Sequence, residues 1–176
     1  MTRYFVALLP PAGIQDSVGA LKQHFAVHYA SEAAQKSPPH ITLQPPFNWL
    51  PERGALEPAL NAFAQSQAPL RVVLSGFAAF APRVIYIRVH ASLELSTLQR
   101  TLADHLRTLG IVDPHAHRPF TPHMTVAFRD LTGQHFKTAW SEFEHRRFDC
   151  EFTASSLALL VHDTRRWNVG AEFPFV

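Results

Sequence analysis

Residues 39–43 (PHITL) and residues 122–126 (PHMTV) carry one pattern, Pro-His-apolar-Thr-apolar, at two places in the chain. Composition alone accounts for ~0.7 bare His-x-Thr patterns, but for only roughly 0.01 with the leading Pro and both apolar neighbours. A third His-x-Thr, His162-Asp163-Thr164, lacks those neighbours and is the one expected by chance. The two full matches therefore indicate a shared structural or chemical role.

The chain around the first match predicts alternating strands and helices. Residues 3–9 form a β-branched and aromatic run, typical of a strand, that ends at Pro10-Pro11. Residues 70–80 predict another strand. Two helices are indicated by apolar residues at three- and four-residue steps: Ile14, Val18, Leu21, Phe25 and Tyr29 before the match, and Leu56, Leu60 and Phe63 after it.

The second half repeats this order. Residues 84–89 predict a strand, residues 148–161 supply further strand material, and residues 167–175 close the chain. The helices are indicated by a leucine stripe that stops at Gly110 and by an aromatic stripe: Leu95, Leu98, Leu102, Leu106 and Leu109, then Phe136, Trp140 and Phe143.

The repeated order predicts an α+β fold built from a duplicated unit, with two lobes related by an approximate twofold axis. The approximate halves are 1–82 and 83–176, and no linker separates them, so residues 1–176 are expected to form a single domain. The alternative is that helices and strands alternate by coincidence, as they do in any α+β chain.

The His and the Thr of each match are two residues apart, and on a strand they project from the same face. If the lobes face each other, His40, Thr42, His123 and Thr125 converge on one cleft. Two imidazoles with an ordinary pKa near 6.5 can serve as base and acid at neutral pH, and hydroxyls can bind phosphate oxygens. This set predicts metal-free cleavage of a phosphodiester, without deciding which His is the base.

The two matches resemble the twin His-x-Thr-x signature of the 2H phosphoesterase superfamily, and residues 3–11 (RYFVALLPP) are similar to the opening strand of its 2'-5' RNA ligase-like branch. The resemblance implies a bilobal fold in which two antiparallel sheets flank a central cleft, with the helices outside. It implies His40 and His123 as the acid-base pair, and Thr42 and Thr125 as phosphate binders.

The resemblance also implies hydrolysis of 2',3'-cyclic phosphates at RNA ends or in small nucleotides, without a metal or other cofactor. The reverse reaction, 2'-5' RNA ligation, is expected only when broken ends are held together. The substrate itself does not carry over. Two alternatives stay open: a phosphodiesterase specific for 2'-5' linkages, and a non-catalytic RNA or nucleotide-binding protein that keeps the cleft.

Weaker candidates surround the four residues. If the second strand continues regularly, Arg129 shares the face of His123 and could bind a phosphate; otherwise it is a surface residue at a strand end. Tyr86 lies on one face of the strand over residues 84–89, together with Arg88 and His90, and could stack on a base. The alternative for this face is an ordinary half-solvated strand.

Phe47 and Phe120 flank the two matches and are candidates for stacking on a nucleobase, although such residues are more often part of a core. His115 and His117 offer a competing metal site, since His-x-His on a strand is a common pair of ligands and His123 is close in sequence. Turn signals bracket this pair, however, and no third ligand is fixed by spacing.

Composition narrows the class of protein. A formal charge of +2 and a pI of about 9.0 are too mild for a protein that grips duplex DNA, but they do not repel small anionic ligands. Cys150 is the sole cysteine, so no disulfide framework is expected. The apolar run over residues 5–9 is too short to span a membrane. We expect a cytoplasmic monomer whose partners are RNA ends or small cyclic nucleotides.

Overall fold

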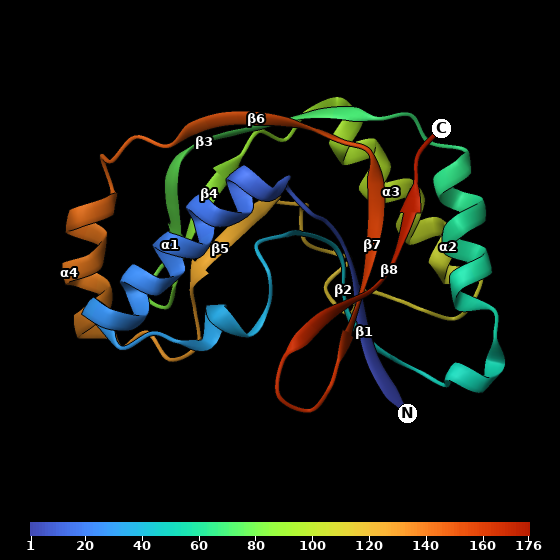
Figure 1. The fold of residues 1–176 in the computed structure, drawn as a ribbon, viewed down its shortest axis with the longest axis horizontal. Coiled ribbons are helices and arrows are strands. Elements are labelled where there is room, and N and C mark those ends of the chain that lie inside the picture. Colours follow the sequence, from blue (N-terminus) through green and yellow to red (C-terminus); the bar gives the residue numbers. More distant parts are fainter.

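The computed structural model describes residues 1–176. Its fold alternates strands and helices along the chain, as the sequence predicts (Figure 1). The elements of the first half are β1 (Thr2–Leu8), α1 (Ala12–Tyr29), a 3-10 helix η1 (Ala33–Lys36), β2 (Ile41–Trp49), a 3-10 helix η2 (Pro51–Arg53), α2 (Leu56–Gln65) and β3 (Leu70–Phe80). Those of the second half are β4 (Val84–Val89), α3 (Leu93–Arg107), β5 (His123–Ala127), α4 (Gly133–Phe143), β6 (Asp149–Ala154), β7 (Ser156–His162) and β8 (Trp167–Pro174).

The strands form two four-stranded sheets, in the orders β2-β1-β7-β8 and β5-β4-β3-β6. Every paired strand is antiparallel to its neighbour. The two orders correspond position by position: β2 and β5 are edge strands, and β1 and β4 lie beside them. The expected α+β fold with two antiparallel sheets is therefore confirmed.

Strands are exchanged between the sequence halves. The first-half strand β3 pairs with β4 and β6, whereas the second-half strand β7 pairs with β1. The boundary near residue 82 thus divides the repeated order of elements but does not separate the two sheets. One contiguous hydrophobic core contains side chains from both sheets.

The strand material expected over 148–161 is two strands rather than one. The chain breaks at the exposed Ser155, and β6 joins one sheet while β7 joins the other. Burial explains the split. Strand β6 alternates exposed and buried residues at the edge of its sheet, whereas β7 is buried from Leu157 to Leu160 because it is a central strand with apolar groups on both faces.

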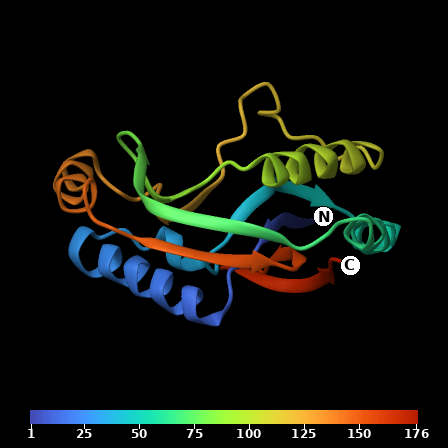
Figure 2. The same cartoon turned by 90° about the horizontal axis from the view of Figure 1, so that it is seen from above.

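The helices lie outside the sheets. Helices α1 and α3 each pack against the sheet that does not contain the preceding strand. Helix α1 follows β1 but packs against β5 and α4, while α3 follows β4 and packs against β2 and α2. Seen from above, α1 and α4 lie at one end of the molecule and α2 and α3 at the other (Figure 2). No helix combines the length and the apolar character needed to cross a membrane.

The two edge strands β2 and β5 contact each other where the sheets meet. Both His-x-Thr patterns lie at these edges, so the topology itself brings them together. Strand β2 also contains Pro45 and Pro46, which an edge strand tolerates because it has ladder hydrogen bonds on one side only.

Candidate active site

A cavity of about 540 Å³ lies between the two sheets, and His40, Thr42, His123 and Thr125 all line it. The structure therefore brings together the four side chains that the paired patterns single out. His40 directly precedes β2, and His123 is the first residue of β5. The apolar residues that alternate with them point the other way and are buried in the core: Ile41, Leu43, Met124 and Val126.

Both imidazoles are fixed by the same backbone contact. The Nδ1 atom of His40 lies 2.7 Å from the carbonyl oxygen of Pro38, and the Nδ1 atom of His123 lies 2.7 Å from that of Thr121. A carbonyl oxygen only accepts, so each Nδ1 carries a hydrogen and donates it. In the neutral ring, Nε2 is then left as a proton acceptor, and in the charged ring it is a proton donor.

Burial lowers the pKa of both histidines. The pKa of His40 falls to about 4, chiefly because burial penalises the charged ring, with smaller contributions from the charges of Lys22 and His123. Burial also lowers the pKa of His123 below its ordinary value. In both cases the carbonyl contact at Nδ1 acts in the opposite direction. Both rings are therefore biased toward the neutral form, and His40 more clearly so.

Lys22 is a cleft residue that the sequence analysis missed. It lies on the buried face of α1, is only 3% exposed, and lines the same cavity as His40. Burial lowers its pKa from 10.5 to about 8. A signal was present in the sequence, because Lys22 lies four residues after Val18 and three before Phe25, within the apolar stripe.

Side chains of α1 hold the segment that precedes the first motif. The Nζ of Lys22 donates to the carbonyl oxygen of Ser37 at 2.8 Å, and the Nε2 of Gln15 donates to that of Pro39 at 3.0 Å. Together with the His40–Pro38 contact, these bonds engage three consecutive carbonyl groups. The position of His40 is thus set by a helix that packs on the opposite sheet.

Arg129 lines the cavity, but not for the reason the alternation suggests. Strand β5 ends at Ala127, and Arg129 has a left-handed backbone with φ of 64°. Its guanidinium lies 5.1 Å from the centre of the Phe128 ring. The condition of a regular strand up to residue 129 is therefore not met, although the side chain still reaches the cleft from the turn.

Asp130 joins this turn to the opposite wall. Its carboxylate accepts hydrogen bonds from the Ser31 hydroxyl and from the backbone amides of Glu32 and Ala33, at 2.9–3.0 Å. These residues lead into η1, which forms part of the cavity wall. The left-handed turn at Arg129 is thus linked to a specific contact across the cleft.

The cavity is lined by more positive than negative side chains. Its cationic residues are Arg3, Lys22, Lys36 and Arg129, and its only carboxylate is that of Asp130, which already accepts three hydrogen bonds. An anionic ligand is therefore favoured between the sheets.

Tyr86 packs against the second motif instead of offering an open ring face. It pairs with Thr125 across β4 and β5 and is 6% exposed. Its ring centre lies 5.2 Å from that of His123 and 4.5 Å from that of Phe80. On the same strand, Arg88 donates to the carbonyl oxygen of Phe77 and does not line the cavity.

Phe47 and Phe120 do not line the cavity either, so the structure does not place them beside the paired histidines. Each is partly buried against the main hydrophobic core. The cavity instead contains Phe80, 42% exposed at the end of β3, and Trp167 at the start of β8. Phe80 was not identifiable because its exposure depends on the β3–β4 hairpin, and Trp167 because its strand joins the first sheet only in the tertiary fold.

His115 and His117 have no third metal-binding side chain placed beside them. Both are exposed in the loop between α3 and β5, which projects from the body of the molecule (Figure 2), and their ring centres are 6.3 Å apart. The structure contains no group of three or more His, Cys, Asp or Glu side chains placed to hold a metal ion.

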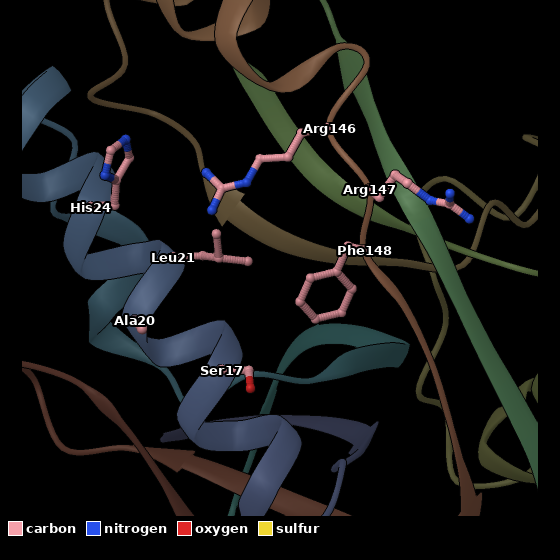
Figure 3. A pocket seen from close by; sticks show the side chains of 7 residues that line it. All are labelled: Ser17, Ala20, Leu21, His24, Arg146, Arg147 and Phe148. Atoms are coloured by element: carbon pink, nitrogen blue, oxygen red, sulfur yellow. The ribbon is translucent and has the colours of Figure 1, made fainter.

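A second cavity of about 360 Å³ lies between α1 and the segment that joins α4 to β6 (Figure 3). Arg146 points into it, toward α1, while Arg147 points away. The carboxylate of Glu142 contacts two of the lining side chains, at 2.8 Å from His24 and 3.8 Å from Arg146. A carboxylate thus lies close to both His24 and Arg146, so this cavity suits an anion less well than the cavity between the sheets.

Comparison with known proteins identifies relatives over most of the chain. The model of the 2'-5' RNA ligase superfamily matches residues 10–166. A protein of Geobacillus kaustophilus named "Putative phosphoesterase" is 27% identical over 97% of this chain and 95% of its own, and a Bacillus pumilus protein of the same name is 28% identical over 97% and 96%.

Two solved structures share the fold. The Thermus thermophilus protein TT0787 has a TM-score of 0.72 at 20% identity, covering 98% of this chain and 97% of its own. The E. coli protein LigT, complexed with 3'-AMP, has a TM-score of 0.66 at 17% identity, covering 99% and 98%.

Proposed function

Because the chain belongs to the 2'-5' RNA ligase superfamily, we propose that it is a metal-independent phosphodiesterase that hydrolyses 2',3'-cyclic phosphates of RNA ends or small nucleotides. One observation carries this proposal. Both imidazoles line one cavity, and each has its Nδ1 engaged by a carbonyl group, so that Nε2 is the free nitrogen in both. Paired nitrogens of this kind suit acid-base chemistry on a single phosphorus atom.

The proposed reaction starts with water in the cleft. The Nε2 of His40 accepts a proton from the water as its oxygen bonds to phosphorus, and the bond from phosphorus to the ribose 3' oxygen breaks. The Nε2–H of His123 protonates that oxygen, which leaves a 2'-phosphate. Thr42 and Thr125 donate hydrogen bonds to the non-bridging oxygens, whose charge grows during the reaction.

The difference in pKa supports these roles for the two histidines. His40, with its pKa of about 4, stays neutral at neutral pH and is the better placed to accept a proton. An anionic phosphate between the rings raises the pKa of both, which favours the protonated form that His123 requires. If a ribose 5'-hydroxyl replaces water as the nucleophile, His40 accepts the proton of that hydroxyl and His123 again protonates the 3' oxygen, so a 2'-5' linkage forms when the two ends are held together.

The aromatic side chains of the cleft support a nucleotide as the substrate. Phe80 comes from one sheet and Trp167 from the other, and both line the cavity. Stacking on such rings tolerates any base. Structures of LigT complexed with 3'-AMP and with ATP are consistent with a nucleotide in this fold. We also propose that the protein acts as a monomer, since one chain supplies both histidines, and in the cytoplasm, where reducing conditions suit its single free cysteine.

The test is incubation of the purified protein with 2',3'-cyclic AMP, and separately with an RNA oligonucleotide ending in a 2',3'-cyclic phosphate, in the presence of a chelator. We expect a 2'-phosphate product, detected by phosphorus NMR, with the His40→Ala/His123→Ala double variant as the inactive control. Activity lost in the chelator would contradict metal independence. Binding without turnover would favour a nucleotide-binding protein, and cleavage of a 2'-5'-linked dinucleotide, with no turnover of either cyclic phosphate, would favour the narrower phosphodiesterase.

A further inference from the structure

Lys22 is a buried cation without an anionic partner. No Asp or Glu lies within salt-bridge distance of its Nζ, and its hydrogen bond is to the neutral carbonyl group of Ser37. An ammonium group has three N–H donors, so this contact leaves two of them free. Burying a charge without a partner is costly, and such groups are concentrated at functional sites.

The other two lysines of the chain show how unusual this position is. Lys36 and Lys137 are exposed, and only Lys22 is held inside the fold. Lys22 lies on α1 and lines the cavity that contains both histidines, and its ammonium group is bonded to Ser37, another lining residue. An anionic ligand in that cavity would supply the missing negative charge.

The segments that precede the two histidines differ in their contacts with α1. The residues before His40 are tied to α1 through Lys22 and Gln15, whereas the contact described before His123 is that of its own ring with Thr121. The cation therefore lies on the His40 side of an otherwise repeated arrangement. A single phosphate bound between the motifs would meet it asymmetrically.

We infer that Lys22 is a substrate-binding residue, whose free N–H groups donate to a non-bridging oxygen of the phosphate held between His40 and His123. The inference rests on the proposed function for the identity of the site. Its chemistry requires only an anionic phosphate group in the cleft. Lys22 then compensates the charge of the ligand, and the ligand compensates the buried ammonium group.

Four variants separate this role from a structural one. Lys22→Arg keeps the charge, Lys22→Gln keeps a donor for the Ser37 carbonyl group without the charge, and Lys22→Met removes both. Lys137→Met is the matched control, since it removes one exposed lysine on α4. The measurement is the affinity for inorganic phosphate at pH 7, by calorimetric titration, together with the melting temperature of each variant.

If Lys22 binds phosphate, Lys22→Gln and Lys22→Met lose about tenfold to a hundredfold in affinity, as expected for a charge-assisted hydrogen bond. Lys22→Arg retains most of the affinity and Lys137→Met retains all of it. Folded Lys22→Gln protein with wild-type affinity would overturn the inference, because a donor to Ser37 would then suffice.

The outcome is independent of turnover. A wild-type protein that binds phosphate through the charge of Lys22 but hydrolyses no cyclic phosphate would retain this inference and contradict the proposed hydrolysis. An active wild-type protein whose Lys22→Gln variant binds phosphate with wild-type affinity would support the proposed hydrolysis and contradict the role of Lys22.

Discussion

Replacing Lys22 with Met should stabilise the protein at neutral pH. Burial lowers the pKa of Lys22 from 10.5 to about 8, so its charged form is disfavoured in the fold. At about 1.4 kcal/mol per pKa unit, keeping this lysine protonated costs about 3 kcal/mol of folding free energy at pH 7. Lys22→Met removes that cost but loses the hydrogen bond to Ser37, worth about 1–1.5 kcal/mol.

The net expectation is a gain of about 1.5–2 kcal/mol in the free energy of unfolding at pH 7. For a chain of this length, each kcal/mol corresponds to about 2–4 °C in melting temperature. The apolar stem of Met fits the stripe that contains Val18 and Phe25 on α1, so no cavity is expected.

The pH dependence gives the sharper assay. Between pH 8 and 10.5 the unfolded state keeps a proton on Lys22 that the folded state has released, so the free energy of unfolding rises with pH through this window. The assay is urea denaturation of wild type and Lys22→Met at pH 7, 8, 9 and 10.5. In the difference between their free energies of unfolding, the contributions of all other titratable groups cancel. The difference between the two proteins should reverse in favour of wild type as the pH rises.

Parallel curves for wild type and Lys22→Met over this window would refute the reasoning, since they would mean that the lysine titrates alike in both states. A Lys22→Met protein less stable than wild type at pH 7 would also contradict it. The Lys137→Met control should leave both the stability and its pH slope unchanged, because that side chain is exposed.

Two further predictions concern the reaction. If His40 is the base, kcat/KM for 2',3'-cyclic AMP falls as the pH drops through about 4, where the His40 ring gains a proton. It falls again as the pH rises through the lowered pKa of His123, where that ring loses its proton. A loss of activity on the acid side that begins at pH 6.5 or above would contradict the lowered pKa of His40. Thr42→Val and Thr125→Val each remove one hydrogen-bond donor to the phosphate at nearly constant side-chain volume. We therefore expect kcat/KM to fall about tenfold to a hundredfold, with the melting temperature within a few degrees of wild type. A variant with full activity would show that the substituted Thr does not bind the phosphate.

The paired patterns carried most of what the sequence could predict. The His and the Thr of each pattern are two residues apart along an extended segment, so the direction of His40, Thr42, His123 and Thr125 followed from local geometry. Their convergence needed only a repeated order of elements. The structure brings them to one cavity because both strands are edge strands that meet.

The errors share a cause, which is dependence on long-range pairing. The strand breaks at Ser155 because the segments on either side of it pair in different sheets. Arg129 reaches the cleft through a left-handed turn, which the alternation of side chains along a strand does not predict. Lys22 was hidden because a charged residue on a helix is normally assigned to the solvent face. Its place in the cleft depends on α1 packing against the sheet that does not contain β1.

The most direct test of the central claim is a double-mutant cycle on 2',3'-cyclic AMP hydrolysis with wild type, His40→Ala, His123→Ala and the double variant. If both imidazoles act on one phosphorus atom, each single variant loses nearly all activity, and the double variant is hardly worse than either single variant. Losses that multiply independently, or a single variant with wild-type kcat/KM, would contradict a shared site.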